Sequence, residues 1–483
     1  MIITNFLFKA RYLLLCVALL GLTVHKPAYS RTYSAAVPDT VTITLADFLT
    51  LATEQSKELQ ARRQNVELAR NTNAGARNSR ILPNFTLTTA HGLIPGVKSR
   101  DDMDLPSSQL YLDPSLRNDW EDWAFFNQFE VTALQPVYTW GAIRNAIKAS
   151  QAGINVSLFE FEAEEQKTKL QLFQLWQGRL LAVELDRLTT EAERTIEMAE
   201  RELIKLFEEG SDEIDDADFY QFEIFKFEFE AQKEEVKRNL EVLERAWAIA
   251  LGSRDSGIIY IPDERFLDPL DAVIEPLETY LAHAAVSRPE LRQIDAVRDA
   301  AGFGVDAQRA QMFPALFVGA TYRYAYAPNR PRQRNPFISN AANTESLTVG
   351  LGFRQNLNFL QLQNRTDRAQ IQLRQAGYAL EAVRDGIELE VSDKYKDAQI
   401  ARTRLSSVER ALDVSRNWLR QEQLDYDIGF GEIPNLIDAF TKNLELEAQQ
   451  KQYIYDFNVR LARLLNAGGF RLDQFFTTNT ADL

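Results

Sequence analysis

The sequence predicts a mainly helical protein that also carries membrane-spanning β-strands, built from two copies of one strand–long-helix repeat. Three observations predict this class. The two halves of the chain share one order of segments. Four short stretches alternate apolar and polar residues, and two helical stretches are too long for a compact domain to bury.

The first 30 residues have the pattern of a secretory signal peptide. Lys9 and Arg11 precede an apolar run, and small residues at 28–30 follow it, so cleavage is expected after Ser30. The run is too short to span a bilayer as a helix. Cys16, the single cysteine, lies inside it. The mature chain would therefore have no thiol, which excludes disulfides and cysteine-ligated metals.

Two stretches of sequence occur in a similar form in each half. The segment from Lys57 (KELQARRQNVELAR) is similar to the one from Pro289 (PELRQIDAVRDAAG), and each predicts a helix that ends before a proline and a strand. RNAIKASQAG, from Arg144, and RAQIQLRQAG, from Arg368, each open a long helix. We therefore predict repeats at 31–251 and 277–467, a proline-rich linker at 252–276 and a tail at 468–483.

Four strands are expected, two in each repeat, at 85–93, 125–135, 316–326 and 347–354. Their length, their alternation and a row of tyrosines at one end are typical of strands that cross a membrane. The polar segments between them, 95–119 and 328–345, are expected to be long external loops. Two soluble hairpins packed on a core would show the same alternation and remain the alternative.

The long helical stretches predict rods that associate as coiled coils. No proline occurs between Tyr138 and Glu209, which allows a helix of about 100 Å. Apolar and small residues recur at spacings of four and three in both halves, with Arg402 as the one exception. The predicted seams are Leu181, Leu185, Leu188, Ala192, Thr195, Ala199, Leu203 and Leu206, and Val391, Tyr395, Ala398, Leu405, Val408, Leu412, Ser415 and Leu419.

If the strands enter a membrane, several copies of the chain must assemble. Four strands cannot close a barrel, and lipid does not tolerate an open sheet edge. Two copies would give about eight strands, whose interior is filled by side chains, whereas three copies give twelve strands and space for water. Cyclic symmetry would then continue a twelve-stranded β-barrel into an α-helical coiled-coil barrel.

Two motifs resemble the TolC-type outer-membrane efflux and secretion ducts. LQPVYTWGAIRNAI resembles that family's strand-to-helix signature through Gln135, Pro136, Tyr138 and Gly141. YDIGFGEIPNLIDA, at 426–439, resembles its second periplasmic hairpin tip. The chain departs from the family at RQNLNFLQLQNR, where a second signature would stand. It also has Gly431 in place of a basic residue and Asn435 in place of the first tip aspartate.

The resemblance implies a homotrimer in the outer membrane of a Gram-negative bacterium, extending into the periplasm. It would be a passive exit duct of a tripartite efflux or type I secretion system, coupled to a periplasmic adaptor protein and an inner-membrane efflux pump or ABC exporter. The alternatives are a non-conducting structural trimeric coiled-coil envelope protein and an autonomous porin. The plan of strands followed by rods favours the duct, since a stalk needs no hairpins and a porin needs no rods.

The second hairpin tip, near 426–438, is the first part of the predicted entrance. Its glycines suit a helix end and a turn, and Pro434 suits the first turn of the next helix. Asn435 and Asp438 are three apart and share a helical face. If that face lines the axis, the Asp438 ring would favour cations and gate the mouth. The alternative is an acid favoured only by the helix dipole. The entrance residues predicted here are Tyr426, Gly429, Gly431, Asn435 and Asp438.

The first hairpin tip, near 208–218, is strongly acidic. Charge runs are usually solvated loops, and that remains the alternative. The resemblance places the entrance and the adaptor contact here, with Asp216 nearest to the family's acidic entrance position. The residues of interest are Gly210, Asp212, Asp215, Asp216 and Asp218, together with Glu208, Glu209 and Glu213.

Composition argues against other classes of function. The net charge of −15 provides no basic stripe for nucleic acid. After signal removal only His91 and His283 remain, so we expect no histidine metal cluster. Nucleophile-elbow, zincin, phosphate-loop and dinucleotide motifs are absent from the sequence, so neither an enzyme nor a cofactor is expected.

Overall fold

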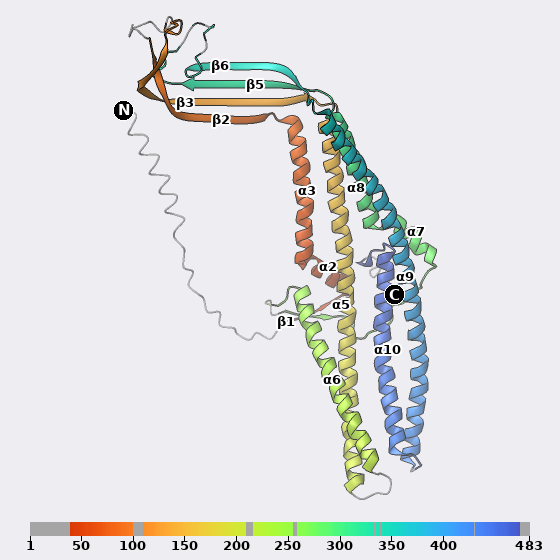
Figure 1. The fold of residues 1–483 in the computed structure, drawn as a ribbon. Coiled ribbons are helices and arrows are strands. Elements are labelled where there is room, and N and C mark those ends of the chain that lie inside the picture. Colours follow the sequence, from red (N-terminus) through yellow and green to blue (C-terminus); the bar gives the residue numbers. More distant parts are fainter. Residues whose placement is uncertain are drawn as a thin grey trace.

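The computed structural model describes residues 39–99, 110–208, 216–254, 258–332, 335, 337–338, 340–428 and 430–473. The predicted signal peptide, the middle of the first external loop and most of the first hairpin tip lie outside these ranges. The described chain is mainly helical, with a four-stranded sheet at the upper end of a long helical rod (Figure 1). In the described ranges, none of the helices has both the length and the apolar content to cross a membrane.

The two halves have the same order of elements, which confirms the predicted duplication of strand and long-helix units. The first half contains β1 Asp39–Ile43, α2 Leu45–Gln55, α3 Lys57–Ile81, β2 Asn84–Lys98, β3 Arg117–Tyr138, α5 Ala142–Glu208 and α6 Asp216–Ala250. The second half contains β4 Ile258–Pro262, α7 Leu277–Ser287, α8 Pro289–Ala310, β5 Ala315–Tyr326, β6 Thr344–Arg354, α9 Phe359–Asp427 and α10 Ile433–Ala467.

The helices form one layer whose composition changes at mid-height. Helices α5 and α9, with 67 and 69 residues, run the full length of about 100 Å, as predicted. In the upper half α3, α5, α8 and α9 lie side by side, and in the lower half the order is α6, α5, α10 and α9 (Figure 1). One lateral edge of the molecule is therefore α3 above α6, and the other is α9.

The strands β2, β3, β5 and β6 pair in that order, all antiparallel. Partners across antiparallel strands point to the same face, so the register defines two faces. One face carries apolar rows such as Phe85, Ala133, Ala320 and Val349, followed by Leu87, Val131, Tyr322 and Leu347. The row between them, Thr86, Thr132, Thr321 and Thr348, lies on the opposite, polar face.

The first strand pair differs from the prediction. We expected a loop across 95–119, but β2 continues to Lys98 and β3 begins at Arg117. The pairing shifts between Pro95 and Gly96, and the ribbon continues beyond the shift. Alternation is broken at that shift, and for this reason the sequence pattern did not show the full strands.

The coiled-coil seam of α9 also needs one correction. Ala401, not Arg402, is the buried seam residue, with 3% of its surface exposed. It lies three residues after Ala398 and four before Leu405, so the heptad spacing is continuous and Arg402 points outward. On α5 the seam passes through Ala192, Ile196 and Leu203, while Thr195 and Ala199 stay exposed. The Leu206 side chain lies outside the described part.

The main core lies at mid-height, where the helical layer changes. Phe48 of α2 stacks on Trp247 at 4.3 Å between ring centroids and lies 5.4 Å from Trp176. Asn458 of α10 is fully buried, donates to Gln177 Oε1 and the Asp268 carbonyl, and accepts the Leu270 amide proton. These bonds hold the segment between the halves against the rod. In the same region β4, which lies within 252–276, pairs in parallel with β1.

Candidate functional site

The strand-to-helix junction of the first repeat is shaped by a bulge and two left-handed residues. Pairing of β3 with β5 shifts between Pro136 and Tyr138, the last residue of β3. Trp140 and Gly141 then take φ values of 53° and 92°. The Trp140 indole donates to the Pro314 carbonyl at 3.0 Å, which ties this turn to the second repeat. Gly141 is suited to its position because a left-handed backbone strains other residues.

A glutamine closes this junction in each repeat. Gln135 Nε2 donates to the Arg80 carbonyl at the end of α3 and to the next carbonyl along the chain, both at 3.0 Å. In the second repeat Gln355 donates to the Met312 carbonyl at 2.9 Å and to the Asn356 carbonyl at 3.2 Å. Gln355 thus makes the same kind of bonds as Gln135, although the second repeat lacks the proline and glycine of the signature. Sequence comparison missed it, yet its position directly after the strand was a usable signal.

At the second hairpin tip, α9 ends at Asp427 and α10 begins at Ile433. The amides of Phe430 and Gly431 both donate to the Asp425 carbonyl, at 2.9 and 2.8 Å. A Cβ on Gly431 would lie 2.5 Å from the Tyr426 amide nitrogen, so no other residue fits without moving the backbone. We expected Gly431 to supply unusual backbone angles. The structure instead requires it for close approach, and Gly431 is not among the glycines of the described part with positive φ.

The two polar residues of this tip share an exposed face. Asn435 and Asp438 both lie in the first turns of α10 and are exposed, whereas Ile433 and Ala439 are buried. Pro434 stands in the first turn, as predicted. Tyr426 packs, half-buried, against the apolar cluster that joins the tips. Gly429 lies outside the described part of the chain.

At the first hairpin tip the structure describes only the two helix ends. Helix α6 begins at Asp216, which is exposed, and Asp218 follows in the same first turn, where the helix dipole favours acids. Gly210, Asp212 and Asp215 lie outside the described residues. The arrangement of the acidic side chains at this tip therefore stays a prediction.

The two hairpins are joined by an apolar cluster near the tips and by a buried acid farther up. In the cluster, Ile433 of α10 packs with Leu203 of α5 and Phe222 of α6. Farther up, Glu184 of α5 is 3% exposed and lies 3.0 Å from Lys451 of α10. Removing one partner of such a pair is costly because a buried charge remains.

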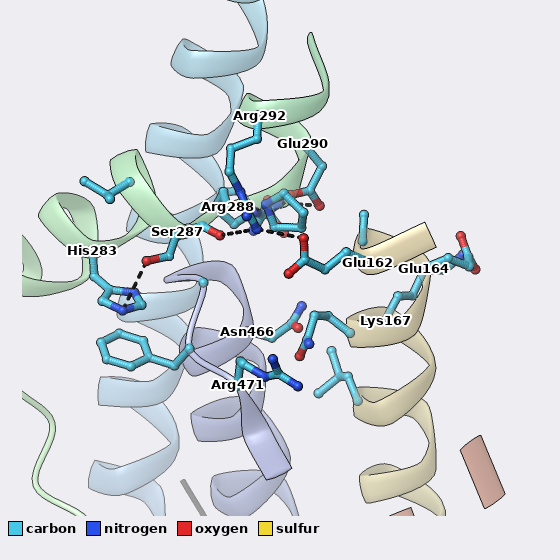
Figure 2. A pocket seen from close by; sticks show the side chains of 18 residues that line it. Glu162, Glu164, Lys167, His283, Ser287, Arg288, Glu290, Arg292, Asn466 and Arg471 are labelled. Carbon is cyan, nitrogen blue, oxygen red and sulfur yellow. Dashed lines mark hydrogen bonds and ion pairs between the residues drawn. The ribbon is translucent and has the colours of Figure 1, made fainter. Parts of the chain in front are cut away.

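A polar cavity of about 900 Å³ lies where α8 begins above the end of α10 (Figure 2). Arg288, 7% exposed, donates to the Ala467 carbonyl at 3.0 Å and to Glu290 and Glu390. Arg292 reaches across to Glu162 of α5 at 2.9 Å (Figure 2). The hydrogen bond to Ala467 joins the start of α8 to the end of α10, and the ion pairs tie α8 to α9 and α5.

His283 completes this joint. Its Nδ1 lies 2.7 Å from the Gly468 carbonyl, which can only accept, so Nδ1 carries the proton. The ring stacks on Phe470 with centroids 3.9 Å apart, and Nε2 accepts from the Ser287 hydroxyl. The imidazole therefore caps the carbonyl of Gly468, the residue directly after α10. Among the described residues no group of three or more His, Cys, Asp and Glu is arranged to hold a metal.

Comparison with known proteins now adds to this geometry. Residues 281–469 match the family model described as outer membrane efflux protein. The match covers the second half of the chain. No curated protein sequence matches the chain.

Solved structures of outer membrane channels have the same fold as this chain. The open state of MtrE from Neisseria gonorrhoeae superposes with a TM-score of 0.70 at 14% identity, covering 89% of each chain. CmeC from Campylobacter jejuni gives 0.69 at 14% identity, covering 91% of this chain and 88% of its own. VceC from Vibrio cholerae gives 0.68 at 14% identity, covering 88% and 96%. At such identities the likeness shows the fold.

The residues matched by the outer membrane efflux protein model run from within α7 to the end of α10. They include Gln355, the second tip and the polar joint at Arg288. The first half, with Gln135 and the acidic tip, has the same order of elements but lies outside the match. The roles of the tip residues therefore rest on the geometry above.

Proposed function

We propose that three copies of this chain form a passive exit duct of the outer membrane efflux type. It would be a twelve-stranded β-barrel in the outer membrane of a Gram-negative bacterium, continued by a helical barrel through the periplasm. The observation that supports this proposal is that the sheet and the helical layer have unpaired edges on the same two sides of the molecule. One side is β2, α3 and α6, and the other is β6 and α9. Head-to-tail contact between these sides closes both layers at once.

The exposed side chains support this closure. On the apolar face of the sheet, large side chains remain in contact with solvent in the single chain, for example Phe353 at 79% and Leu351 at 75% exposure. A soluble monomer rarely leaves so continuous an apolar face uncovered. Along the rod edges, Tyr220, Ile224 and Phe227 form an exposed stripe on α6. Lipid would cover the first surface and a neighbouring copy the second.

Three copies of each tip would meet at the lower mouth. There the exposed Asp438 and Asn435 of α10 and Asp216 of α6 would line the entrance and present acidic rings. Three carboxylates about 8 Å apart repel by roughly 2 kcal/mol per pair at an effective dielectric near 20. Such a mouth would select cations, and the repulsion would push the three tips apart. A periplasmic adaptor and an inner-membrane pump would open it and deliver the cargo.

Planar-bilayer recording of the purified protein tests the duct. We expect a small cation-selective conductance, and its preference for cations should fall when Asp438→Asn and Asp216→Asn are combined. The matched control is Asp385→Asn, the same charge change at an exposed site high on α9. Light scattering in detergent should give the mass of three chains. A monomer would refute the closure, and a trimer without conductance would support a structural coiled coil instead.

A further inference from the structure

An apolar cavity of about 330 Å³, partly open to solvent, lies between the two hairpins near their tips. All four lower helices line it. Its apolar walls include Leu203, Phe222, Phe225, Ile433, Ile437 and Phe440. The cavity exists because α5 presents Thr195 and Ala199 to it, and these small side chains leave space that leucines would fill. It is large enough for a small organic molecule.

Aromatic rings from both hairpins meet at the cavity. Phe225 of α6 and Phe440 of α10 lie edge to face, with centroids 6.4 Å apart. Phe222 lies 6.5 Å from Phe225, and Tyr426 of α9 lines the opposite side. Such rings offer apolar area and electron-rich faces, which attract both aromatic groups and organic cations. A molecule held here would contact the two hairpins simultaneously.

The polar groups at the cavity are few, and one of them is an acid. Besides Thr195, whose hydroxyl donates to the Glu191 carbonyl, the polar lining residues are Glu202 and Gln423. Glu202 pairs with Lys205 at 3.3 Å, but both side chains are more than half exposed. An exposed pair of this kind is weak, so the carboxylate can exchange its partner for a ligand cation.

The surroundings of the cavity are strongly negative. Ranges 195–208, 216–226 and 419–440 contain twelve acidic and four basic residues, a formal charge of −8. More than half of the net charge of −15 is therefore concentrated around this site. A field of this sign accumulates cations and repels anions.

We propose that this cavity binds a lipophilic cation, with its aromatic body between the hairpins and its positive charge toward Glu202. The site is formed within one chain, so the proposal does not depend on conduction. Its occupant would link α5 and α6 to α9 and α10. This inference goes beyond the duct, because a duct needs no ligand between its hairpins.

The test compares two ions of nearly equal size and shape and opposite charge. Full-length protein in lipid nanodiscs is dialysed against tetraphenylphosphonium or tetraphenylborate, and uptake by empty nanodiscs is subtracted. We expect saturable phosphonium binding at one site per chain, at least about tenfold tighter than borate, since a carboxylate about 6 Å away favours the cation. Equal affinities, or phosphonium uptake that never saturates, would overturn the proposal.

Variants locate the bound ion. Ala199→Leu and Thr195→Leu each fill the cavity and should weaken phosphonium binding by about tenfold or more. Ala231→Leu, the same change at an exposed site on α6 away from the cavity, should have no effect. Glu202→Gln, at the surface, should reduce the preference for the cation without preventing folding. Identical binding by Ala199→Leu and Ala231→Leu would place the ion elsewhere, and an unchanged preference in Glu202→Gln would reject the role of the acid.

Discussion

Replacement of Gly431 by alanine is expected to open the turn between α9 and α10. The new Cβ would lie 2.5 Å from the Tyr426 nitrogen and 2.9 Å from the Asp425 carbonyl carbon, and both are backbone atoms. The chain must move away, which breaks the two bonds from the Phe430 and Gly431 amides to the Asp425 carbonyl. At about 1 kcal/mol per bond plus about 1 kcal/mol of residual strain, the loss is roughly 2–3 kcal/mol.

Hydrogen exchange followed by mass spectrometry measures this loss at the tip. A decrease of 2–3 kcal/mol in local opening free energy speeds exchange in peptides over 425–431 by about 30- to 150-fold. The control is Gly386→Ala, in the exposed middle of α9, where an added Cβ has no neighbour within 4 Å. That change should stabilise the helix by about 0.5–1 kcal/mol. Tip exchange in Gly431→Ala equal to wild type would refute the close-approach argument.

Three further predictions concern the rod, the sheet and pH. Lys451→Met leaves Glu184 with one fewer cation and should cost about 1–3 kcal/mol, seen as a lower thermal midpoint by circular dichroism; Glu184→Gln added to it should restore part. Gly352→Val places a Cβ 2.8 Å from the Phe317 ring, so the ring must move on the polar face of the sheet, and we expect the conductance to fall. Gly350→Val is the control, because a Cβ there has no neighbour within 4 Å and the conductance should not change. Desolvation raises the pKa of Glu264, so its protonated carboxyl favours the folded state as pH falls through this raised pKa toward the ordinary value. Glu264→Gln should therefore gain most in thermal midpoint at pH 7.5 and less at pH 5, and equal gains at both would contradict this.

The long elements could be predicted because their signal is repeated many times. In α5 and α9 the absence of proline and the regular seam extend over dozens of residues, so one irregular position does not hide the helix. Arg402 shows the limit. It was aligned to the seam by residue counting, but Ala401 beside it is the residue that packs. The short strands β1 and β4 were missed because five residues carry little pattern and their partners are far apart in sequence.

The junction and the tip show what sequence reasoning could not supply. The signature was recognised in the first repeat through Gln135, Pro136, Tyr138 and Gly141, whereas the second repeat keeps only the glutamine interaction, made by Gln355. A glutamine has no distinctive local preference, and its partner carbonyls lie some 40 to 55 residues earlier. Gly431 was recognised in the sequence, but the turn requires glycine there because backbone atoms of the folded turn lie too close for a Cβ. Distances of that kind appear only in three dimensions.

The change of helices at mid-height has a mechanical consequence. Only two of the four rods at each height, α5 and α9, continue through that level, while α3 and α8 begin and α6 and α10 end near it (Figure 1). A bend there would strain two helix backbones rather than four, so we expect the rod to bend most easily at this level, where Arg288 bonds the start of α8 to the end of α10. The sheet could then keep its position while the lower parts of the helices move.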